Sequence, residues 1–481
     1  MKHFIFILSL LLLTQFTNAQ TVYKEFEVDS VAKPHGGLPL LEKFIDVNRR
    51  MPYAADVARV KGAVILSTVI EPNGTVSDIT VLRSLRPDCD REAIRLLRSF
   101  KAWKPALKAG QPVRQNLTYT IRFTPSAAQS EPGAITMYYD RDGRAVADEA
   151  QARFKLMTPV DTLGLPNGNP VISERKGNKW QKTVENRFER IPYNRANEDD
   201  PSLPDSIPAI RLAIKDPQYK FLNGTIYSLY SNGAVMAREP YDDGKPIGRS
   251  VYYYRNGVVK LISEIRPDGK TEEWAWHPNG QLQHVLMRKL VAMSPEEIEL
   301  FSQWDSTGKQ LVQNGQGTAR FLSRQEGKWV TETGQINEQR KEGLWLGRFD
   351  DGKLAFRESY QNGKCESGVA YYESDSLTYT NPNQNPEFQG GLNGLGKFLS
   401  TNISYPPDAA RAGIRGRVFV SFVVCQDGSL CDYEVLRGVH PSVDNEALRV
   451  VKASNGKWKP GAIRGKQVRV KYNLPINFQM E

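Results

Sequence analysis

The sequence predicts an α+β protein in which two small domains, each with helices packed on an antiparallel sheet, flank a region of antiparallel β-hairpins. The first observation is a duplication, because Gly36-Gly37-Leu38 recurs as Gly390-Gly391-Leu392 and Trp103-Lys104-Pro105 recurs as Trp458-Lys459-Pro460. The second is a series of Asn-Gly turns behind aromatic residues, in the sequence between the two copies. A module repeated at both ends indicates a multidomain binding protein.

Residues 1–19 are expected to form an export signal. Lys2 and His3 precede an apolar run from Phe4 to Leu13, polar residues follow, and Ala19 is a small residue of the kind found at cleavage sites. The run is well short of the ~20 apolar residues that a membrane-spanning helix needs. We therefore expect cleavage after Ala19 and a mature protein that is periplasmic or associated with the cell envelope.

The two copies, residues 30–124 and 385–481, predict domains with the same order of elements. Alternating apolar residues mark the strands, Asn-Gly and Asp-Gly mark turns, and apolar residues at i, i+4 and i+7 mark one face of a helix. The expected elements are a helix (41–48 or 394–401), a strand (63–70 or 418–424), a strand through Val81-Leu82 or Val435-Leu436, a helix with Asp90 or Asp444 as its N-cap, and a last strand (113–123 or 468–478). The last strand has no later partner in its domain, so we expect it to leave an exposed sheet edge.

Residues 135–376 follow a different pattern. Tyr230-Ser231-Asn232-Gly233, Tyr254-Arg255-Asn256-Gly257 and His277-Pro278-Asn279-Gly280 recur at nearly equal spacing. Strand, Asn-Gly turn and strand at that period predict a row of stacked β-hairpins, each too small to bury its apolar face alone. A charged segment at 294–300, with Ser294 as N-cap, is expected to interrupt the row as a helix. The aromatic residues near the turns either cover the faces of the hairpins or stack on sugars.

Composition and motifs argue against several functions. The net charge is +10, but the cations are scattered and an exported chain rarely meets nucleic acid, so we expect no nucleic-acid partner. The five histidines are isolated and show no metal-ligand spacing, so we expect no metal site. The segment 391–398 has the glycine and lysine spacing of a phosphate-binding loop, but Phe398 stands where a Ser or Thr is required. We expect no enzymatic activity and no cofactor.

Two of the four cysteines are candidates for a disulfide, which an exported protein allows. Cys425 and Cys431 flank the turn at Asp427-Gly428. A three-residue loop centred on this turn would place the two cysteines directly opposite each other, whereas a two-residue Asp-Gly turn would leave them out of register. The alternatives are a hairpin disulfide and two small buried or edge thiols.

The C-terminal copy resembles the C-terminal domain of TonB-family proteins. The segments that carry the resemblance are Tyr405-Pro406, Gly416–Val424, Asp427-Gly428, Val435-Leu436-Arg437-Gly438, Asp444–Leu448, Lys457-Trp458-Lys459-Pro460-Gly461 and Val468–Phe478. The N-terminal copy is a more divergent relative of the same domain, because Met51-Pro52-Tyr53 replaces Tyr-Pro and no glycine follows Trp103-Lys104-Pro105. The middle resembles MORN-type repeats through its short Tyr-x-Asn-Gly motif.

The resemblance implies a protein that binds outer-membrane transporters or other envelope proteins by edge-strand pairing, in the setting of energy-coupled transmembrane transport. In that family the domain pairs its edge strand with an extended peptide of the transporter plug, so a TonB-box-like peptide is the expected partner. The edge would consist of Val468, Arg469, Val470, Lys471, Tyr472 and Asn473. Arg469 and Lys471 would supply charge complementarity, and Trp458 would pack in the core beside the strand.

Energy transduction also needs an inner-membrane anchor and a long proline-rich spacer, and neither is evident once residues 1–19 are removed. If the N-terminal apolar run is kept as an anchor, inner-membrane energising proteins become expected partners. The alternative function is a non-transducing envelope scaffold that binds peptidoglycan or protein through the hairpin repeats.

Overall fold

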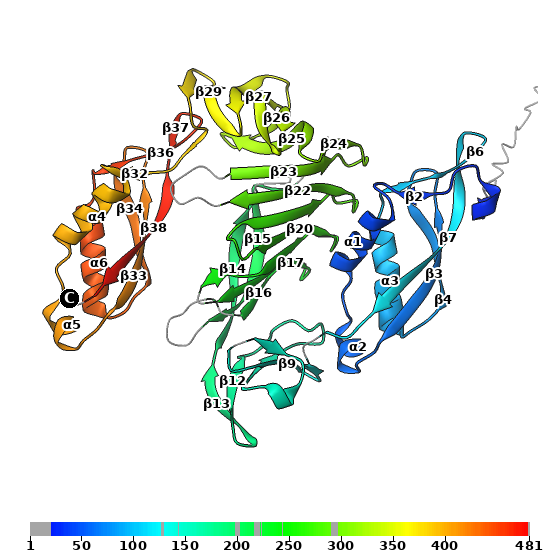
Figure 1. Cartoon of the computed structure of the whole chain (residues 1–481), viewed down its shortest axis with the longest axis horizontal. Helices are drawn as coiled ribbons and strands as arrows, with labels where there is room; N and C mark the ends of the chain where they lie inside the picture. The colour runs from blue at the N-terminus through cyan, green and yellow to red at the C-terminus, as the bar shows by residue number, and fades with distance from the viewer. Residues whose placement is uncertain are drawn as a thin grey trace, which may run out of the picture.

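The computed structural model describes residues 21–479 apart from 127–128, 143, 198–202, 216–221, 223, 243 and 290–296. In these residues two α+β domains lie on either side of a long antiparallel sheet, with a smaller sheet beside it (Figure 1). The expected signal peptide, residues 1–19, lies outside the described residues. In the part of the chain that is described, no helix is both long enough and apolar enough to span a membrane.

The N-terminal domain packs its helices on a sheet with the strand order β1-β7-β3-β4, and β6 also pairs with β7. Its elements are β1 (Val22–Tyr23), η1 (Glu25–Glu27), β2 (Lys33–Pro34), α1 (Leu38–Asn48), α2 (Tyr53–Val57), β3 (Gly62–Ile70), β4 (Val76–Arg83), α3 (Pro87–Ser99), β5 (Trp103–Lys104), β6 (Ala106–Lys108) and β7 (Gln111–Phe123). Ala93 and Leu97 of α3 are buried, and Phe100 at its end is buried as well, as their helical spacing predicts.

The middle of the chain contains two sheets, not the single row of hairpins that we expected. The smaller sheet consists of β8 (Gln129–Glu131), β9 (Ala134–Tyr139), β10 (Ala145–Val146), β11 (Phe154–Pro159), β12 (Val171–Lys176) and β13 (Lys179–Glu185), with η2 (Glu149–Gln151) between β10 and β11. The larger sheet has 17 strands in chain order. They are β14 (Arg187–Ala196), β15 (Ser206–Lys215), β16 (Gly224–Tyr230), β17 (Val235–Asp242), β18 (Lys245–Pro246), β19 (Arg249–Tyr253), β20 (Val259–Ile265), β21 (Thr271–Trp276), β22 (Leu282–Lys289), β23 (Glu297–Trp304), β24 (Gln310–Gln313), β25 (Gln316–Gln325), β26 (Lys328–Asn337), β27 (Arg340–Phe349), β28 (Leu354–Gln361), β29 (Lys364–Tyr371) and β30 (Ser376–Tyr379).

Aromatic residues at the Asn-Gly turns join one hairpin of the long sheet to the next. The Tyr230 hydroxyl donates a hydrogen bond to the carbonyl oxygen of Tyr253 at 2.8 Å. The Tyr254 hydroxyl donates in the same way to the carbonyl oxygen of Trp276, also at 2.8 Å. Each tyrosine therefore buries its ring against the sheet while its polar end satisfies a backbone group of the following repeat.

The C-terminal domain repeats the order of elements of the N-terminal one. Its elements are β31 (Asn383–Gln384), β32 (Glu387–Phe388), α4 (Gly391–Asn402), α5 (Pro407–Arg411), β33 (Gly416–Val424), β34 (Leu430–Arg437), α6 (Pro441–Ala453), β35 (Trp458–Lys459), β36 (Gly461–Ile463), β37 (Lys466–Val468) and β38 (Val470–Phe478). Short pairs correspond as well, since Lys33 pairs with Lys104 in the first domain and Glu387 pairs with Lys459 in the second.

The expected helix at 294–300 is wrong over the residues that the structure describes. Residues from Glu297 onward form β23, which pairs with β22 on one side and with β24 on the other. Leu300 is buried, and Ser294 lies outside the described residues. Hydrogen bonds to a strand on each side and an apolar position on the buried face outweigh the helical preference of a charged segment.

The expected N-caps are also wrong. α3 and α6 begin at Pro87 and Pro441, whose fixed φ suits the first helical position, so Asp90 and Asp444 lie within the first turn. Each carboxylate reaches back and accepts a hydrogen bond from an amide that precedes the helix. Oδ1 of Asp90 accepts from the Leu85 amide at 3.1 Å, so these aspartates still stabilise the helix start.

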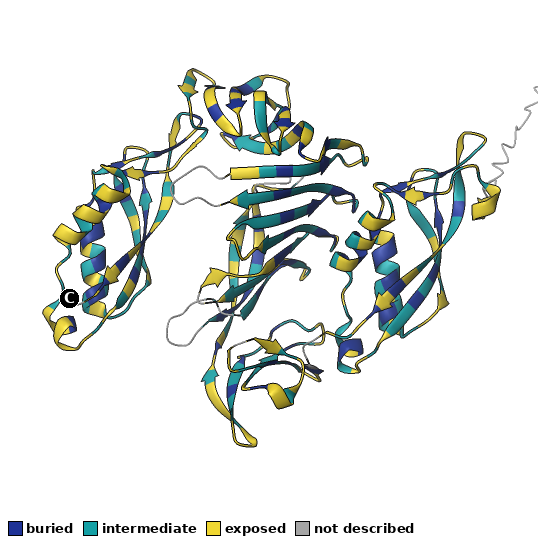
Figure 2. Cartoon of the chain, viewed as in Figure 1, coloured by how far each residue is buried: buried dark blue, intermediate teal, exposed yellow. Residues whose placement is uncertain are grey.

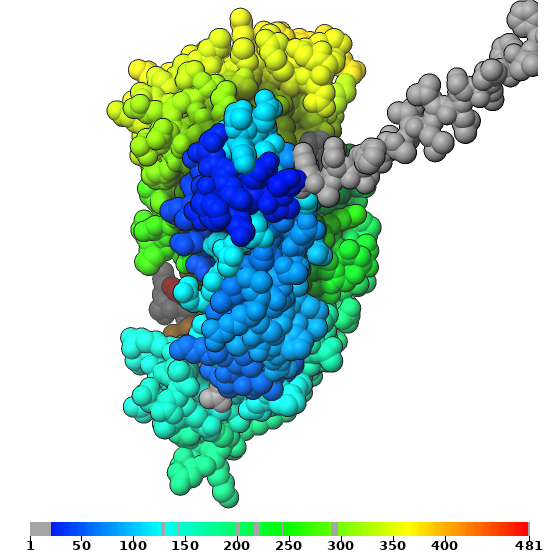
Figure 3. All heavy atoms as spheres, turned by 90° about the vertical axis from the view of Figure 1, so that its right-hand side faces the viewer, coloured from blue at the N-terminus to red at the C-terminus, as the bar shows by residue number. Residues whose placement is uncertain are grey.

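The two terminal domains contact the middle through opposite faces. In the N-terminal domain α1 and α3 face the long sheet, and one hydrophobic core continues from Phe44 and Phe100 to Val259 and Trp276 (Figures 1 and 2). Figure 3, viewed from the side of this domain, shows it in front of the middle region. In the C-terminal domain the sheet faces the middle, α4 and α6 lie on the far side, and the core contains only residues of that domain.

Candidate partner-binding edges

β38 lies at the edge of the three-stranded sheet of the C-terminal domain. The strand order is β34-β33-β38, and β38 pairs with β33 along its whole length, from Val470 with Val424 to Phe478 with Gly416. Among the described residues no second strand pairs with β38. The outer row of its backbone N–H and C=O groups is therefore not used by any described strand.

Pro475 indicates which residues of β38 direct their backbone groups outward. Proline has no N–H, so within a sheet it is accepted where that group would face away from the paired strand. The backbone N–H and C=O groups of successive residues in an antiparallel strand point alternately toward and away from the paired strand. Lys471 and Asn473, like Pro475, therefore direct these groups away from β33. An added strand would hydrogen-bond to the backbone of these two residues, at the part of β38 that still has its donors.

The predicted edge residues are divided between two strands. Val468 belongs to β37 and pairs with Gly461, Arg469 lies between β37 and β38, and residues 470–473 belong to β38. The sequence had suggested one continuous strand from 468 to 478. The role of these residues in binding a partner stays a prediction.

Side chains of the edge alternate between the core and the open face of the sheet. The ring centre of Tyr472 lies 5.5 Å from that of Phe422 and 5.0 Å from that of Trp458, so Tyr472 packs β38 against the core of the domain. Trp458 is 5% exposed, which confirms its expected position in the core. Lys471 and Asn473 are exposed on the opposite face.

The two cations of the edge lie on the open face and meet acids of β34. Nη2 of Arg469 is 2.7 Å from Oδ2 of Asp432, and Nζ of Lys471 is 3.7 Å from Oε2 of Glu434. All four side chains are more than half exposed. Exposed pairs of this kind contribute little to stability, about 0–1 kcal/mol each, and a competing carboxylate can exchange with them.

In the N-terminal domain the corresponding edge is partly occupied by the chain itself. Val22 and Tyr23 form β1, which pairs in parallel with Arg114 and Gln115 of β7. The Lys108 ammonium lies 4.1 Å from the centre of the Tyr23 ring. Residues that follow β1 continue the contact. Their hydrogen bonds include one from the amide of Ala109 to Asp29 (2.6 Å) and one from the amide of Ala32 to the side chain of Gln115 (2.6 Å).

The two copies differ because their leading residues pair with different strands. Aligning the duplicated sequences places Val22-Tyr23 at Ser376-Leu377, and Arg114-Gln115 at Arg469-Val470. Ser376 and Leu377 belong to β30, where they pair with Tyr371 and Ala370 of the long sheet. Among the residues that the structure describes, the C-terminal copy thus has no counterpart of β1, and the edge of β38 has no strand beside it.

A buried arginine fastens the C-terminal domain to the long sheet just before the open edge. Arg464, at the tip of the β36–β37 hairpin, is 8% exposed, and its guanidinium lies 3.5 Å from the centre of the Phe356 ring. Nη2 is 2.7 Å from Oε1 of Glu332, and Nε is 3.0 Å from Oε1 of Glu358. Burial acts to raise the pKa of Glu332, but Lys341 and Arg464 outweigh it and bring that pKa to about 2.

The two candidate disulfide cysteines are separate thiols in the structure. Pairing of β33 and β34 places Val423 opposite Cys431 and ends at Val424 and Leu430, while the Cys425 amide donates to the Ser429 carbonyl. The cysteines are therefore not directly opposite each other. The neighbouring Cys425 side chain raises the pKa of the Cys431 thiol, and the bridge remains a prediction.

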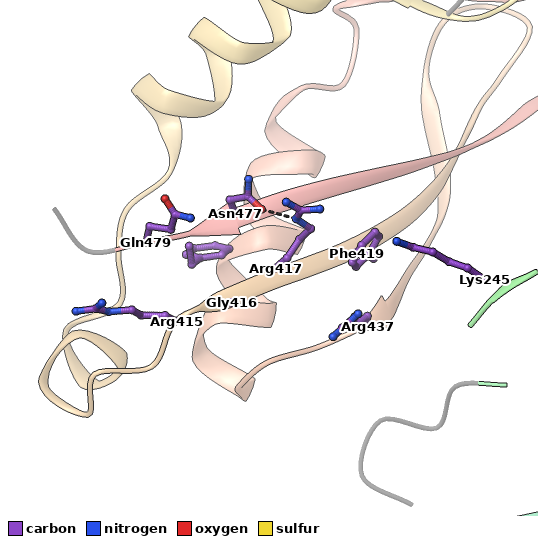
Figure 4. A pocket seen from close by; sticks show the side chains of 9 residues that line it. Lys245, Arg415, Gly416, Arg417, Phe419, Arg437, Asn477 and Gln479 are labelled. Atoms are coloured by element: carbon purple, nitrogen blue, oxygen red, sulfur yellow. Dashed lines mark hydrogen bonds between the residues drawn. The ribbon is translucent and has the colours of Figure 1, made fainter. Parts of the chain in front are cut away.

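A cationic cleft lies at the far end of β38, and the sequence analysis did not find it. The cleft has a volume of about 620 Å³ and is lined by Arg415, Gly416, Arg417, Phe419, Arg437, Asn477, Phe478 and Gln479, and by Lys245 from the long sheet (Figure 4). Lys245 and Arg415 are 170 positions apart in the sequence, so their charges meet only through the docking of the C-terminal domain on the middle. No local pattern could have shown this.

Comparisons with known proteins agree with the duplication. Residues 47–125 and 401–480 both match the profile of the Gram-negative bacterial TonB protein C-terminal domain. Two solution structures of the TonB C-terminal domain from Helicobacter pylori are similar to part of this chain. The longer fragment is 25% identical over 18% of this chain and 78% of its own, and the shorter is 27% identical over 18% and 91%; both have a TM-score of 0.16. No curated protein matches the sequence.

Each end of this chain therefore carries a TonB C-terminal domain. Domains of this family generally interact with outer-membrane transporters, and TonB family proteins are associated with the cell envelope. The resemblance of the middle to MORN-type repeats stays a prediction.

Proposed function

We propose that the C-terminal TonB domain binds an envelope partner by adding one of the partner's strands to the open edge of β38. The partner in this proposal is an extended, TonB-box-like segment of an outer-membrane transporter, and the protein acts in the periplasm or at the cell envelope without catalysis. Backbone hydrogen bonds along Lys471 and Asn473 would give affinity, and side chains on the two faces would give specificity.

One observation carries the proposal. The edges of the two TonB domains are unequal, since β1 occupies part of the β7 edge in the first copy, whereas β38 pairs with β33 alone among the described strands. The N-terminal domain also shares its core with the long sheet. We infer that the first copy is mainly structural and that the C-terminal copy receives the partner.

Asn473→Pro in the full-length chain tests this proposal. The substitution removes an outward N–H and leaves the hydrogen bonds to β33 in place, so the domain should fold while strand addition is lost. Asn473→Ala is the matched control, because it keeps the backbone donor. With a photoreactive residue at position 471, cross-links to an outer-membrane transporter should appear in the Ala variant and disappear in the Pro variant. Equal cross-linking in both variants would contradict strand addition.

A second candidate function has support from a groove on the long sheet. It has a volume of about 470 Å³, and its lining includes the half-buried Tyr252 and Tyr253, with Arg195 and Arg255 at its side. Aromatic faces with nearby polar groups suit sugars, so the groove favours the scaffold that binds peptidoglycan. Cosedimentation with purified peptidoglycan should then fall on Tyr252→Ala and stay unchanged on Asn473→Pro. The opposite result would favour the edge.

A further inference from the structure

We propose that the cationic cleft at the end of β38 binds carboxylate groups of the same peptide partner, so that the partner carries acidic residues next to its β-pairing segment. This inference rests on the proposed function, because it assigns the cleft to a peptide that is already held along β38. It adds the chemistry of that peptide: an apolar or neutral strand followed or preceded by Asp or Glu.

Charge is the first support for this site. Lys245, Arg415, Arg417 and Arg437 line the cleft, and no described residue of its lining is acidic. Cations gathered in one hollow raise the local concentration of anions. Figure 4 shows Lys245 reaching from the long sheet toward Phe419, while the arginines come from the C-terminal domain.

Local contacts preorganise part of the cleft. Nε of Arg417 donates to Oδ1 of Asn477 at 2.5 Å, which fixes the side chain at the cleft (Figure 4). The Arg437 guanidinium lies 5.8 Å from the centre of the Phe419 ring, an arrangement that holds it over an apolar surface. A planar guanidinium held in place can bind a carboxylate through two parallel hydrogen bonds.

Position connects the cleft to the edge. Asn477 and Phe478 are the last residues of β38 and pair with Arg417 and Gly416 of β33, so they belong both to the edge strand and to the cleft. A strand added to β38 would place a residue beside Asn477, with neighbouring side chains on one face about 4.5–5.5 Å apart. Because Asn477 already contacts Arg417, an Asp or Glu at or just beyond that position would reach the arginines.

Short synthetic peptides test the inference on the full-length protein. In the first pair, a peptide of alternating valine and threonine ends in Glu-Glu and its control ends in Gln-Gln. In the second pair, Glu-Glu or Gln-Gln stands at the N-terminal end, because a partner strand can pair with β38 in either direction. Calorimetry should show that one Glu peptide binds about fivefold more tightly than its Gln match, as expected for two exposed ion pairs. The preference should fall as salt is raised from low to physiological concentration.

Variants separate the cleft from the edge. Arg415→Gln combined with Arg417→Gln should abolish the preference for Glu, whereas Lys397→Gln, an exposed cation on α4, should preserve it. Amide exchange of residues 471–473 should slow with every peptide that binds.

The outcomes distinguish the two proposals. Equal affinity for Glu and Gln peptides, with slowed exchange along β38, would overturn the cleft inference and leave strand addition intact. Binding without any change in exchange along β38 would overturn strand addition. Equal peptide affinities together with cleft-dependent binding to phosphatidylglycerol vesicles would show that the cleft meets a lipid surface instead of a peptide.

Discussion

Nη2 of Arg464 lies 2.7 Å from Oε1 of Glu332, and this contact joins the C-terminal TonB domain to the long sheet of the middle region. Both side chains are about one-tenth exposed or less. Glu358 completes the cluster and also accepts hydrogen bonds from the hydroxyls of Tyr360 and Tyr379, each at 2.8 Å. Because the hairpin that carries Arg464 leads directly into β38, the cluster sets where the open edge is presented.

Arg464→Met should strongly weaken this docking. The substitution leaves Glu358 buried without its cation and leaves Glu332 with Lys341 alone, and breaking a buried pair in this way typically costs about 3–5 kcal/mol. We expect a lower urea midpoint for the intact chain and a larger radius of gyration in X-ray scattering as the C-terminal domain separates from the middle. Arg411→Met, on exposed α5, is the matched control and should change neither measurement. Adding Glu332→Gln and Glu358→Gln to Arg464→Met should recover part of the loss, and an unchanged midpoint in Arg464→Met would show that the cluster does not fasten the domains.

The same cluster should make stability sensitive to acid. The pKa of Glu332 is about 2 in the folded protein against an ordinary value of 4.5, so the folded state favours the ionised form. Its contribution is complete above pH 4.5 and is lost as the pH falls from 4.5 toward 2. The difference in unfolding free energy between wild type and Glu332→Gln should therefore shrink over this range. A constant difference from pH 7 to pH 3 would contradict the low pKa.

Thiol labelling should decide the fate of Cys425 and Cys431. Cys425 and Cys431 are neighbours at the end of the β33–β34 hairpin, whereas Cys89 and Cys365 are buried in separate parts of the chain. We expect oxidation in the periplasm to join the first pair. Protein purified from that compartment and denatured without reductant should then show at most two free thiols, and four would rule the bridge out.

Much of the terminal domains could be predicted from sequence because local signals and the duplication agree. Turn glycines, apolar alternation and the Trp-Lys-Pro segment set the order of elements, and Trp458 lies in the core as expected. Boundaries were less secure. Asp90 resembles an N-cap, but Pro87 starts the helix earlier, and a strand on each side makes Glu297–Trp304 extended despite its helical charge pattern.

The features that distinguish the two copies could not be predicted locally. Arg464 corresponds to Ala109 in the duplicated sequence, and nothing next to either residue shows that only the former meets Glu332 and Glu358. The cationic cleft likewise needs Lys245 to approach the C-terminal domain. Such contacts depend on how the domains dock. Docking brings together segments that are distant in the sequence, so it produces no periodic sequence pattern.

Removing β1 should open the edge of the N-terminal copy. A chain that begins at Glu25 lacks Val22 and Tyr23, so the outward backbone groups of β7 around Arg114 and Gln115 lose their parallel partner. Exchange of amides 114–116 should accelerate, while exchange along β38 stays unchanged. The rest of the domain should stay folded, since its core is continuous with the long sheet and involves neither deleted residue.

A peptide with the sequence of residues 21–27 provides the decisive step. Added to the shortened chain, it should restore slow exchange at 114–116, because it supplies the missing strand in trans, and a peptide with proline at the positions of Val22 and Tyr23 should not. If β1 occupies the position at which a partner strand binds in the C-terminal domain, the unmodified peptide at higher concentration should also bind there. It should then slow amide exchange at residues 469–470, which correspond to 114–115. Restoration at 114–116 with no effect at 469–470 would mean that β1 is specific to its own domain, and the N-terminal copy would then be no guide to where a partner joins the C-terminal one.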